Sequence, residues 1–274
     1  MNGNYKYKIA VFDIDGTLID RNEVLFKGIL EGLTSLKLQG VDLFLATGRN
    51  VRSIKDLKLP KEFFELFDSN FICNDGNVIY NYQNDKVNIL KWVSSSTFIS
   101  VIKNYSKSAS FVVESNGLLY TNCKSALMKY KLIYRTPREA IKFVNTEKLC
   151  KLRDVTEVHL FYNENIINFR DIPIKYPDLN VYSVNHFNGI KLYPANSCKA
   201  EGLKENFVPR GINIENVIAF GDAENDSTML EKCGCGVAVV NCKEILNTIA
   251  DLKLEMELGM YLQKWSESLR GIYQ

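Results

Sequence analysis

Several features that mark other classes of protein are missing from this sequence. No uninterrupted apolar run approaches the roughly 18 residues that a membrane-spanning helix needs. The polar N-terminal segment 1–8 does not have the pattern of a signal peptide. Lys and Arg number 34 against 32 Asp and Glu, and a formal charge of +2 gives no support for nucleic acid as the main partner. We therefore expect neither a membrane nor a nucleic acid as partner.

Histidine and cysteine give little support for a zinc or disulfide function. The only histidines are His159 and His186, and Cys233 and Cys235 form an isolated C-x-C, which is too little for a zinc site. The seven cysteines are an odd number at irregular spacings, which predicts free thiols in a reducing cytoplasm. Neither G-x-G-x-x-G nor a Walker lysine motif occurs, so we expect no dinucleotide or nucleoside triphosphate cofactor.

Three short apolar runs share one design and indicate a parallel sheet. Lys8–Phe12, Val41–Ala46 and Asn216–Phe220 each end abruptly at small and polar residues. Continuous apolar runs of this length are typical of strands that are buried on both faces. Apolar residues at helical spacing in 23–39, followed by Gly40, predict a helix between the first two runs. With further strands at 71–73 and 237–240 and a short helix from about 243, the pattern predicts an α/β fold with a doubly wound, Rossmann-like parallel-sheet core.

The middle of the chain has a different pattern, which predicts an inserted α+β cap domain. Glu157–Tyr162 alternates as a half-buried strand does, and Thr97–Tyr105 has the pattern of an amphipathic helix. Asn-rich connectors flank the region. We place the core domain at 1–81 and 189–274 and the cap at 82–188. We expect a monomer or a weak homodimer.

One stretch of the predicted cap is basic despite the balanced total. Residues 123–153 contain nine Lys or Arg, against Glu139 and Glu147 as the only acidic residues. Such a stretch is either a solvated helical face or a collar that attracts anionic substrates. The sequence leaves both interpretations open.

Polar residues gather where the predicted strands end, and this is where open α/β sheets bind ligands. Asp13 and Asp15 follow the first strand, Thr47 follows the second, and Asp222 follows the third. The same cluster would include Asn225 and Asp226. Several carboxylates repel one another unless a cation holds them, and an oxygen-only ligand set suits Mg²⁺. Magnesium in turn indicates a phosphate substrate.

These segments carry four motifs in the order found in a known family. Asp13–Leu18 reads D-I-D-G-T-L, Thr47–Arg49 reads T-G-R, Lys199 stands alone, and Gly221–Asp226 reads G-D-A-E-N-D. The sequence resembles the haloacid dehalogenase-like hydrolase superfamily, specifically the Cof-type sugar phosphatases with an inserted cap. The resemblance covers nearly the whole chain and implies a phosphatase that hydrolyses a small phosphorylated metabolite, most plausibly a sugar phosphate.

The resemblance assigns a role to each motif residue. Asp13 would be the nucleophile that forms an aspartyl-phosphate, and Asp15 would protonate the leaving group and later activate water. The implied Mg²⁺ ligands are Asp13, the backbone carbonyl of Asp15, Asp222 and Asp226. The implied phosphate- or substrate-binding residues are Thr47, Gly48, Lys199, Asn225 and Arg49. Asp226 has a further interpretation, in which it orients Lys199 or a metal-bound water.

Some alternatives remain at this stage. Thr47 could cap a helix, and Arg49 could pair with a surface carboxylate instead of reaching substrate. His186 could face the active site, whereas His159 lies in a strand pattern and is interpreted as structural. The sequence Asp75-Gly76-Asn77 departs from the family's frequent Asn-Gly-Ala. A phosphohexomutase would use the same Asp13, and a metabolite-sensing protein would keep only the fold, although every catalytic position here holds a competent residue.

Overall fold

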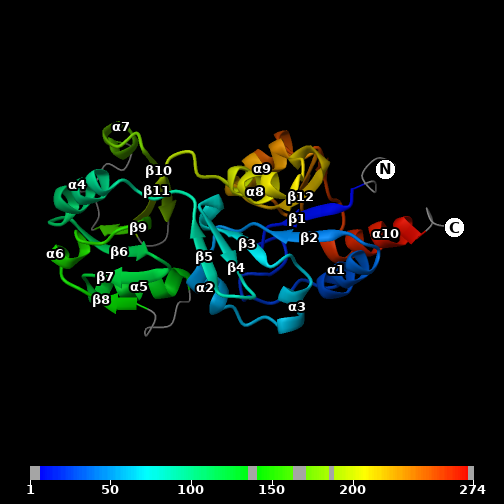
Figure 1. Ribbon diagram of the computed structural model, residues 1–274, viewed down its shortest axis with the longest axis horizontal. Coiled ribbons are helices and arrows are strands. Elements are labelled where there is room, and N and C mark those ends of the chain that lie inside the picture. Colours follow the sequence, from blue (N-terminus) through cyan, green and yellow to red (C-terminus); the bar gives the residue numbers. More distant parts are fainter. Residues whose placement is uncertain (1–6, 135–140, 163–170, 185–187, 271–274) are drawn as a thin grey trace. The chain divides into compact units, whose positions relative to one another are not determined.

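The chain divides by its internal contacts into two compact units. The computed structural model describes residues 7–134, 141–162, 171–184 and 188–270 (Figure 1). The first, the core unit, consists of Met1–Gly48, Leu57–Lys86 and Cys198–Gln274. The second, the insert unit, consists of Arg49–Asp56 and Val87–Ser197. Each is described below by itself.

The core unit is built on a parallel sheet of order β14-β13-β12-β1-β2. Its strands are β1 (Ile9–Phe12), β2 (Asp42–Leu45), β12 (Val217–Gly221), β13 (Cys235–Ala238) and β14 (Leu252–Lys253). The two central strands are apolar throughout because helices cover both faces of the sheet. Phe12 and Phe220, in register on these strands, stack with ring centroids 4.7 Å apart. Burying one such ring contributes about 2–3 kcal/mol.

Helices cover the sheet on both sides, which confirms the predicted α/β core. Its helices are α1 (Ile29–Leu38), α3 (Lys61–Glu65), α8 (Lys199–Phe207), α9 (Ser227–Lys232) and α10 (Leu258–Arg270). α1 packs against α10, and α8 packs against α9 (Figure 1). The fully buried Trp265 of α10 lies against Phe220 of the sheet, with ring centroids 6.2 Å apart.

Two details of the core differ from the sequence prediction. The helix predicted for 23–39 begins only at Ile29, because Leu25 forms an antiparallel bridge with Ile19 and Gly28 adopts a left-handed φ of 76°. The strand predicted at 71–73 is β3 (Asn70–Cys73), which pairs antiparallel with β4 (Val78–Asn81). β3 is joined to the residue after β2 by a single parallel bridge, between Ala46 and Ile72. The fifth strand of the parallel sheet is β14, not the predicted strand at 71–73.

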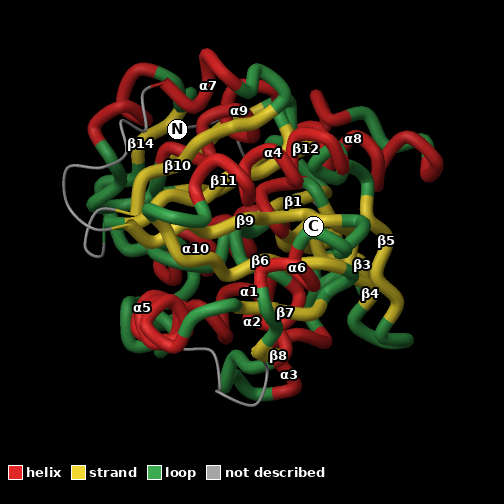
Figure 2. Tube along the Cα trace, turned by 90° about the vertical axis from the view of Figure 1, so that its left-hand side faces the viewer, coloured by secondary structure: helices red, strands yellow, loops and turns green. Residues whose placement is uncertain are grey.

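The insert unit is an α+β structure built on a six-stranded sheet of order β10-β11-β9-β6-β7-β8 (Figures 1 and 2). Its strands are β6 (Ala109–Ser115), β7 (Leu118–Thr121), β8 (Ile141–Phe143), β9 (Val155–Tyr162), β10 (Leu179–Val184) and β11 (Gly189–Pro194), and β5 (Lys86–Ile89) leads into the unit. Its helices are α2 (Val51–Lys55), α4 (Ser95–Tyr105), α5 (Lys124–Tyr134), α6 (Thr146–Leu149) and α7 (Ile172–Lys175). The predicted helix at Thr97–Tyr105 corresponds to α4.

One strand of this sheet buries polar side chains as well as apolar ones. Glu157 and His159 of β9 are 3% and 0% exposed. Tyr130 and Tyr134 of α5 pack edge-on against the His159 ring, with centroids 4.9 and 5.1 Å away. Glu157 accepts hydrogen bonds from His159 at 3.2 Å and from Lys191 at 3.5 Å. Both faces of β9 are therefore buried.

The unit boundaries differ from the predicted domain boundaries. Residues 189–197 were assigned to the core, but β11 pairs with β9 and β10 and so belongs to the insert sheet. Arg49–Asp56 also groups with the insert unit. One reason is that the Asn50 amide donates a 2.8 Å hydrogen bond to the Tyr130 hydroxyl.

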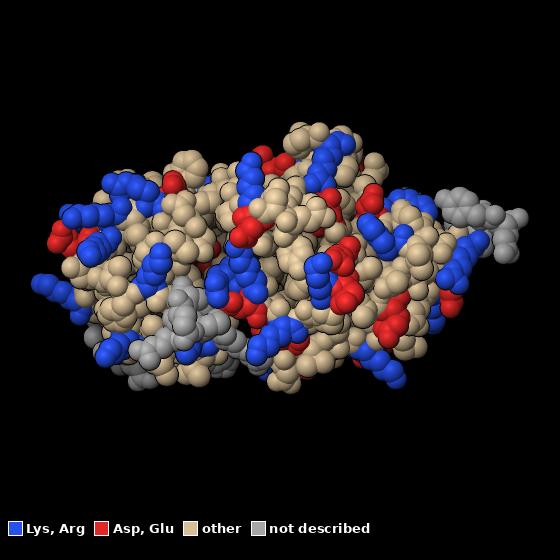
Figure 3. All heavy atoms as spheres, turned by 60° about the horizontal axis from the view of Figure 1, so that its bottom comes forward, with Lys and Arg blue, Asp and Glu red and all other residues tan. Residues whose placement is uncertain are grey.

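The basic stretch of the insert unit is mostly exposed where the structure describes it. Its exposed basic residues are Lys124, Lys142, Lys148, Lys151 and Arg153. Lys151 pairs with Glu147 at 2.7 Å. On the face in Figure 3, the basic side chains of this unit are spread over the surface. Among the described residues, no helix is long and apolar enough to cross a membrane.

Candidate active site

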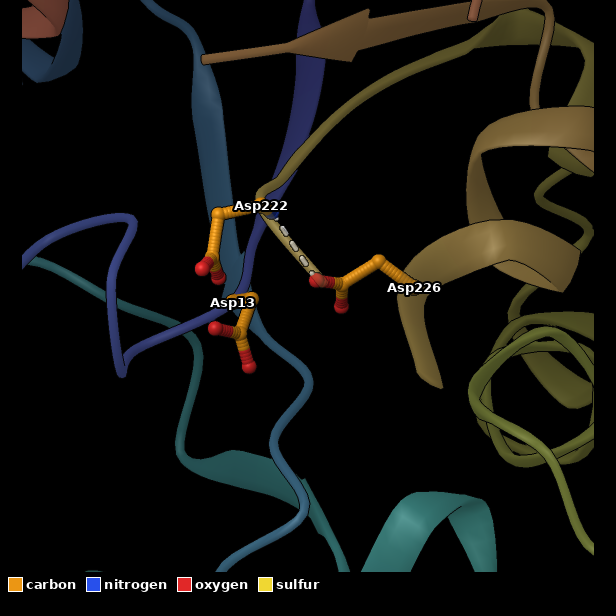
Figure 4. Close-up of side chains that lie close together, drawn as sticks. All are labelled: Asp13, Asp222 and Asp226. Carbon is orange, nitrogen blue, oxygen red and sulfur yellow. Dashed lines mark hydrogen bonds between the residues drawn. The ribbon is translucent and has the colours of Figure 1, made fainter. Parts of the chain in front are cut away.

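Two aspartates lie side by side because the strands that precede them are parallel neighbours. Asp13 follows β1 directly and Asp222 follows β12 directly, and the Asp13 backbone N–H donates to the Phe220 carbonyl at 3.0 Å. Asp226 begins the turn into α9. Carboxylate oxygens of Asp13, Asp222 and Asp226 all lie within 4.8 Å of one another (Figure 4). The predicted convergence of these three residues is therefore found in the structure.

A buried lysine contacts two members of this group. Lys199 is the first residue of α8 and is 0% exposed. Its ammonium group donates to Asp13 Oδ1 and, at 2.6 Å, to Asp226 Oδ1. Asp226 Oδ2 accepts the backbone N–H group of Asp222 (Figure 4) and that of Ala223, both at 3.0 Å. Asp226 therefore contacts both Lys199 and the Asp222 loop, and its two predicted roles, as a metal ligand or as a residue that orients Lys199 or a metal-bound water, stay predictions.

Burial and neighbouring carboxylates disfavour the negative charge of two of these aspartates. Burial raises the pKa of Asp13 well above its usual range, and Asp226, Asp15 and Asp222 add to this although Lys199 opposes it. Burial and then Asp226 raise the pKa of Asp222 to about 6. Burial works against the charge on Lys199, but Asp13, Asp226 and Asp75 outweigh it and raise its pKa. Oxygen donors with excess negative charge suit a hard divalent cation.

Asp15 differs from Asp13 in its exposure. Asp13 is 4% exposed, whereas Asp15 is exposed to solvent. The turn after Asp15 depends on Gly16, which has a left-handed φ of 81°. A Cβ at this position would overlap the Asp222 carboxylate. Thr17 Oγ1 donates to Asp222 Oδ1 at 3.5 Å, a contact that the sequence did not predict. An accessible carboxyl group close to a buried one is suited to exchange protons with substrate and water.

The turn after β2 places the second motif beside the fourth. The Thr47 backbone N–H donates to the Ile72 carbonyl at 2.8 Å, and Thr47 is buried. Asn225 Nδ2 lies 3.1 Å from the point that a Cβ on Gly48 would occupy. Asn50, not Thr47, caps α2 through its contact with the Ser53 N–H. Thr47 is therefore not used as a helix cap.

One residue outside the predicted set of site residues contacts a member of that set. Asp75 is 6% exposed, and its Oδ1 accepts a hydrogen bond from Asn225 Nδ2 at 2.8 Å. The signal was the departure from the family pattern at Asp75-Gly76-Asn77. Arg49 belongs to the insert unit, so its predicted contact with substrate stays a prediction. His186 lies outside the described residues, while His159 is buried within the insert sheet.

Comparison with known proteins identifies the class of this chain. A model of the haloacid dehalogenase-like hydrolases matches residues 10–256, and the chain belongs to this family. A phosphoglycolate phosphatase of Methanosarcina acetivorans is 26% identical over 254 residues, which cover 93% of this chain and 92% of that protein.

Solved structures share the fold over nearly the full length. A haloacid dehalogenase-like hydrolase from Bacteroides thetaiotaomicron superposes with a TM-score of 0.80 at 22% identity and covers 94% of this chain and 99% of that one. The subclass IIB sugar phosphatase BT4131 has a TM-score of 0.76 at 20% identity, with 94% and 98% coverage. The chain is thus a haloacid dehalogenase-like hydrolase, and the two named relatives, the phosphoglycolate phosphatase and the sugar phosphatase BT4131, are phosphatases.

Proposed function

We propose that this phosphatase hydrolyses a small phosphate monoester, with a sugar phosphate as its substrate, through an aspartyl-phosphate on Asp13 and with Mg²⁺ as cofactor. The observation that carries the proposal is the arrangement at the end of β1. A buried Asp13 in contact with Lys199 lies two residues before an exposed Asp15. This arrangement supports the proposal, because Asp13 would be a nucleophile with an accessible proton donor close to it in the chain.

Two displacements at phosphorus would complete the reaction. Asp13 attacks the phosphorus, the bond to the leaving oxygen breaks, and Asp15 gives that oxygen a proton. Water then attacks the aspartyl-phosphate while Asp15 takes a proton from it, which returns Asp13 to its carboxylate form. Lys199, the Thr47 hydroxyl and the Gly48 N–H would stabilise the charge on the phosphoryl oxygens.

The cation would be held by Asp13, Asp222 and the backbone carbonyl of Asp15, with Asp226 beside them. Its chemistry would be to neutralise the charge between carboxylate and phosphate. The raised pKa values of Asp13 and Asp222 support this ligand set, because burial and then neighbouring carboxylates disfavour their negative charge, and a bound cation would offset both effects.

The substrate assignment draws on a relative and on the two-unit organisation. BT4131, named a sugar phosphatase, has the same fold over nearly its full length. The insert unit would act as the cap that selects the group carrying the phosphate. A reducing cytoplasm as the place of action fits the seven free cysteines. The phosphoglycolate phosphatase relative makes a small phosphorylated acid the second substrate class to test.

A phosphate-release screen tests the activity and separates it from phosphohexomutase activity. We expect inorganic phosphate from sugar phosphates in the presence of Mg²⁺, and loss of this signal with a chelator. Conversion of one sugar phosphate into another without phosphate release would show a mutase. Release that persists without any divalent cation would contradict the metal assignment.

Pre-steady-state kinetics tests the role of Asp15. With p-nitrophenyl phosphate the leaving group needs no proton, so Asp15→Asn should still form the aspartyl-phosphate but hydrolyse it slowly. We expect a burst of p-nitrophenolate stoichiometric with enzyme, followed by a slow steady rate. Asp13→Asn should give no burst. Absence of a burst in both variants would mean that Asp15 is not the base for the second step.

A further inference from the structure

A strained turn of the core unit packs against the start of the helix that carries Lys199. Asn74 and Asp75 have φ values of 51° and 52°, in the left-handed region that residues with a Cβ rarely adopt, and Gly76 follows at 91°. Two consecutive non-glycine residues in this conformation persist only where surrounding structure enforces them. Such strain is concentrated at functional sites, so the contacts of this turn need an explanation.

Close packing enforces the conformation. A Cβ on Gly76 would overlap the Cys198 carbonyl, immediately before Lys199. A Cβ on Gly202, one turn further along α8, would lie 2.6 Å from the Gly76 Cα. The turn and the N-terminus of α8 are therefore fixed against each other through backbone contacts.

The side chain and the backbone of Asp75 reach the other two phosphate-binding segments. The Asp75 N–H donates to the Thr47 carbonyl at 3.1 Å. Its Oδ1 accepts from Asn225 Nδ2 at 2.8 Å and lies 2.8 Å from the point that a Cβ on Gly48 would take. One residue thus connects the turn after β2 with the loop before α9.

We infer that Asp75 is a positioning residue for the phosphoryl group, acting through its hydrogen bond to Asn225 and through the place it fixes for Gly48. The inference rests on the proposed phosphate-binding role of Thr47, Gly48 and Asn225. The hydrogen bond orients the Asn225 amide, and this part of the function needs an acceptor oxygen but no charge. An asparagine at position 75 would supply that acceptor and also tolerate the left-handed backbone.

Two substitutions separate the hydrogen bond from the fold. Asp75→Gly removes the side chain without adding backbone strain, and Asp75→Asn keeps the acceptor. Asp85→Gly is the matched control, because Asp85 is also an aspartate of the core unit with a left-handed φ of 58° but contacts Tyr80 instead of the site. The measurements are the Kd of inorganic phosphate by calorimetry with Mg²⁺, kcat and KM for p-nitrophenyl phosphate, and Tm.

For Asp75→Gly we expect the phosphate Kd and KM to rise about tenfold, with kcat changed less than about threefold. Asp75→Asn and Asp85→Gly should stay within about threefold of wild type in all three constants. All variants should keep a Tm close to that of wild type. The inference would be overturned if Asp75→Gly kept the phosphate Kd and KM of wild type, or if Asp75→Asn raised them as much as Asp75→Gly does. A fall in Tm that accompanies the weaker phosphate binding would overturn it too.

A double-mutant cycle tests the partner. If Asp75 acts through Asn225, the phosphate Kd of Asp75→Gly/Asn225→Ala should equal that of Asn225→Ala alone, whereas additive effects would show independent roles. The binding measurements do not need turnover. If the wild type bound phosphate but hydrolysed no ester, the proposed function would be wrong, and the phosphate Kd values of the variants would still test the role of Asp75. A wild type that binds no phosphate would overturn the inference.

Discussion

The core unit buries Asp13, Asp226 and Lys199 where strands end, whereas the insert unit buries Glu157, His159 and Lys191 in the middle of neighbouring strands. In the core the charges come from separate loops, and the carboxylates outnumber the lysine that contacts them. In the insert, Glu157 accepts hydrogen bonds from both His159 and Lys191, which are direct partners across β9 and β11.

This difference separates a reactive cluster from a stabilising one. The raised pKa values of Asp13 and Asp222 mean that folding works against their negative charge. Under the proposed function, such a site lowers the stability of the fold but lets its groups bind a cation and a phosphate. In the Glu157 cluster, the contact between Glu157 and Lys191 joins β9 to β11, so it holds neighbouring strands together. Substitutions should therefore affect activity in the core and stability in the insert.

The largest effect is expected for Asp13→Asn. It removes the proposed nucleophile but little volume, so kcat should fall more than about 10³-fold. Because burial disfavours the Asp13 charge, the metal-free variant should unfold at no lower temperature than wild type. Phosphate release and thermal unfolding check the two parts. A retained rate would contradict the mechanism, and a lower Tm would contradict the contrast between the units.

The corresponding change in the insert is Glu157→Ala. It removes the buried carboxylate that lies 3.5 Å from Lys191, whose side chain is only 10% exposed, and should lower the free energy of unfolding by about 3 kcal/mol. Glu147→Ala is the matched control, because its ion pair with Lys151 is exposed and its loss should cost no more than about 0.5 kcal/mol. Urea unfolding measures both. Equal effects would show that burial does not distinguish the two pairs.

A smaller effect should appear when pH changes the charge of the core cluster. The folded protein holds Asp222 at a pKa of about 6 instead of the ordinary 3.8, so between these values it binds a proton that the unfolded chain has lost. Stability of the metal-free protein should therefore rise by about 1 kcal/mol as pH falls from about 7.5 to 5. Mg²⁺ should reduce this rise, because it stabilises the ionised form. The unfolding temperature at each pH, with chelator or with Mg²⁺, is the measurement.

The smallest effect concerns the basic stretch of the insert. If it attracts anionic substrates, kcat/KM should fall about threefold as the Debye length shrinks from about 30 to about 10 Å, while kcat stays nearly constant. An activity series in added NaCl tests this. No dependence of kcat/KM on salt would favour the solvated face.

Local sequence predicted the parts of the molecule that local rules control. The continuous apolar runs of β1, β2 and β12 predicted buried strands, and their polar ends placed Asp13 and Asp222 together because parallel strands end at one edge. Gly40 ends α1 with a φ of 75°, as predicted.

Distant contacts decided the features that were not predicted. The burial of Glu157 depends on Lys191, which comes from another strand. Neither the left-handed φ of Asp75 nor its bond to Asn225 can be inferred from neighbouring residues. The start of α1 depended on a bridge between Leu25 and Ile19.

The order of the chain through the two units has a consequence for synthesis on the ribosome. Every segment of the insert unit precedes Cys198, whereas the core sheet needs β12 and β13, which begin at Val217 and Cys235. β1 therefore leaves the ribosome soon before β2 but long before β12, the strand that pairs with its other edge, and the insert unit can fold first. Until β12 is made, this apolar edge of β1 stays open to wrong pairing, which a chaperone would prevent. Translation arrested just before β12 should leave a protease-resistant insert and a degradable N-terminus.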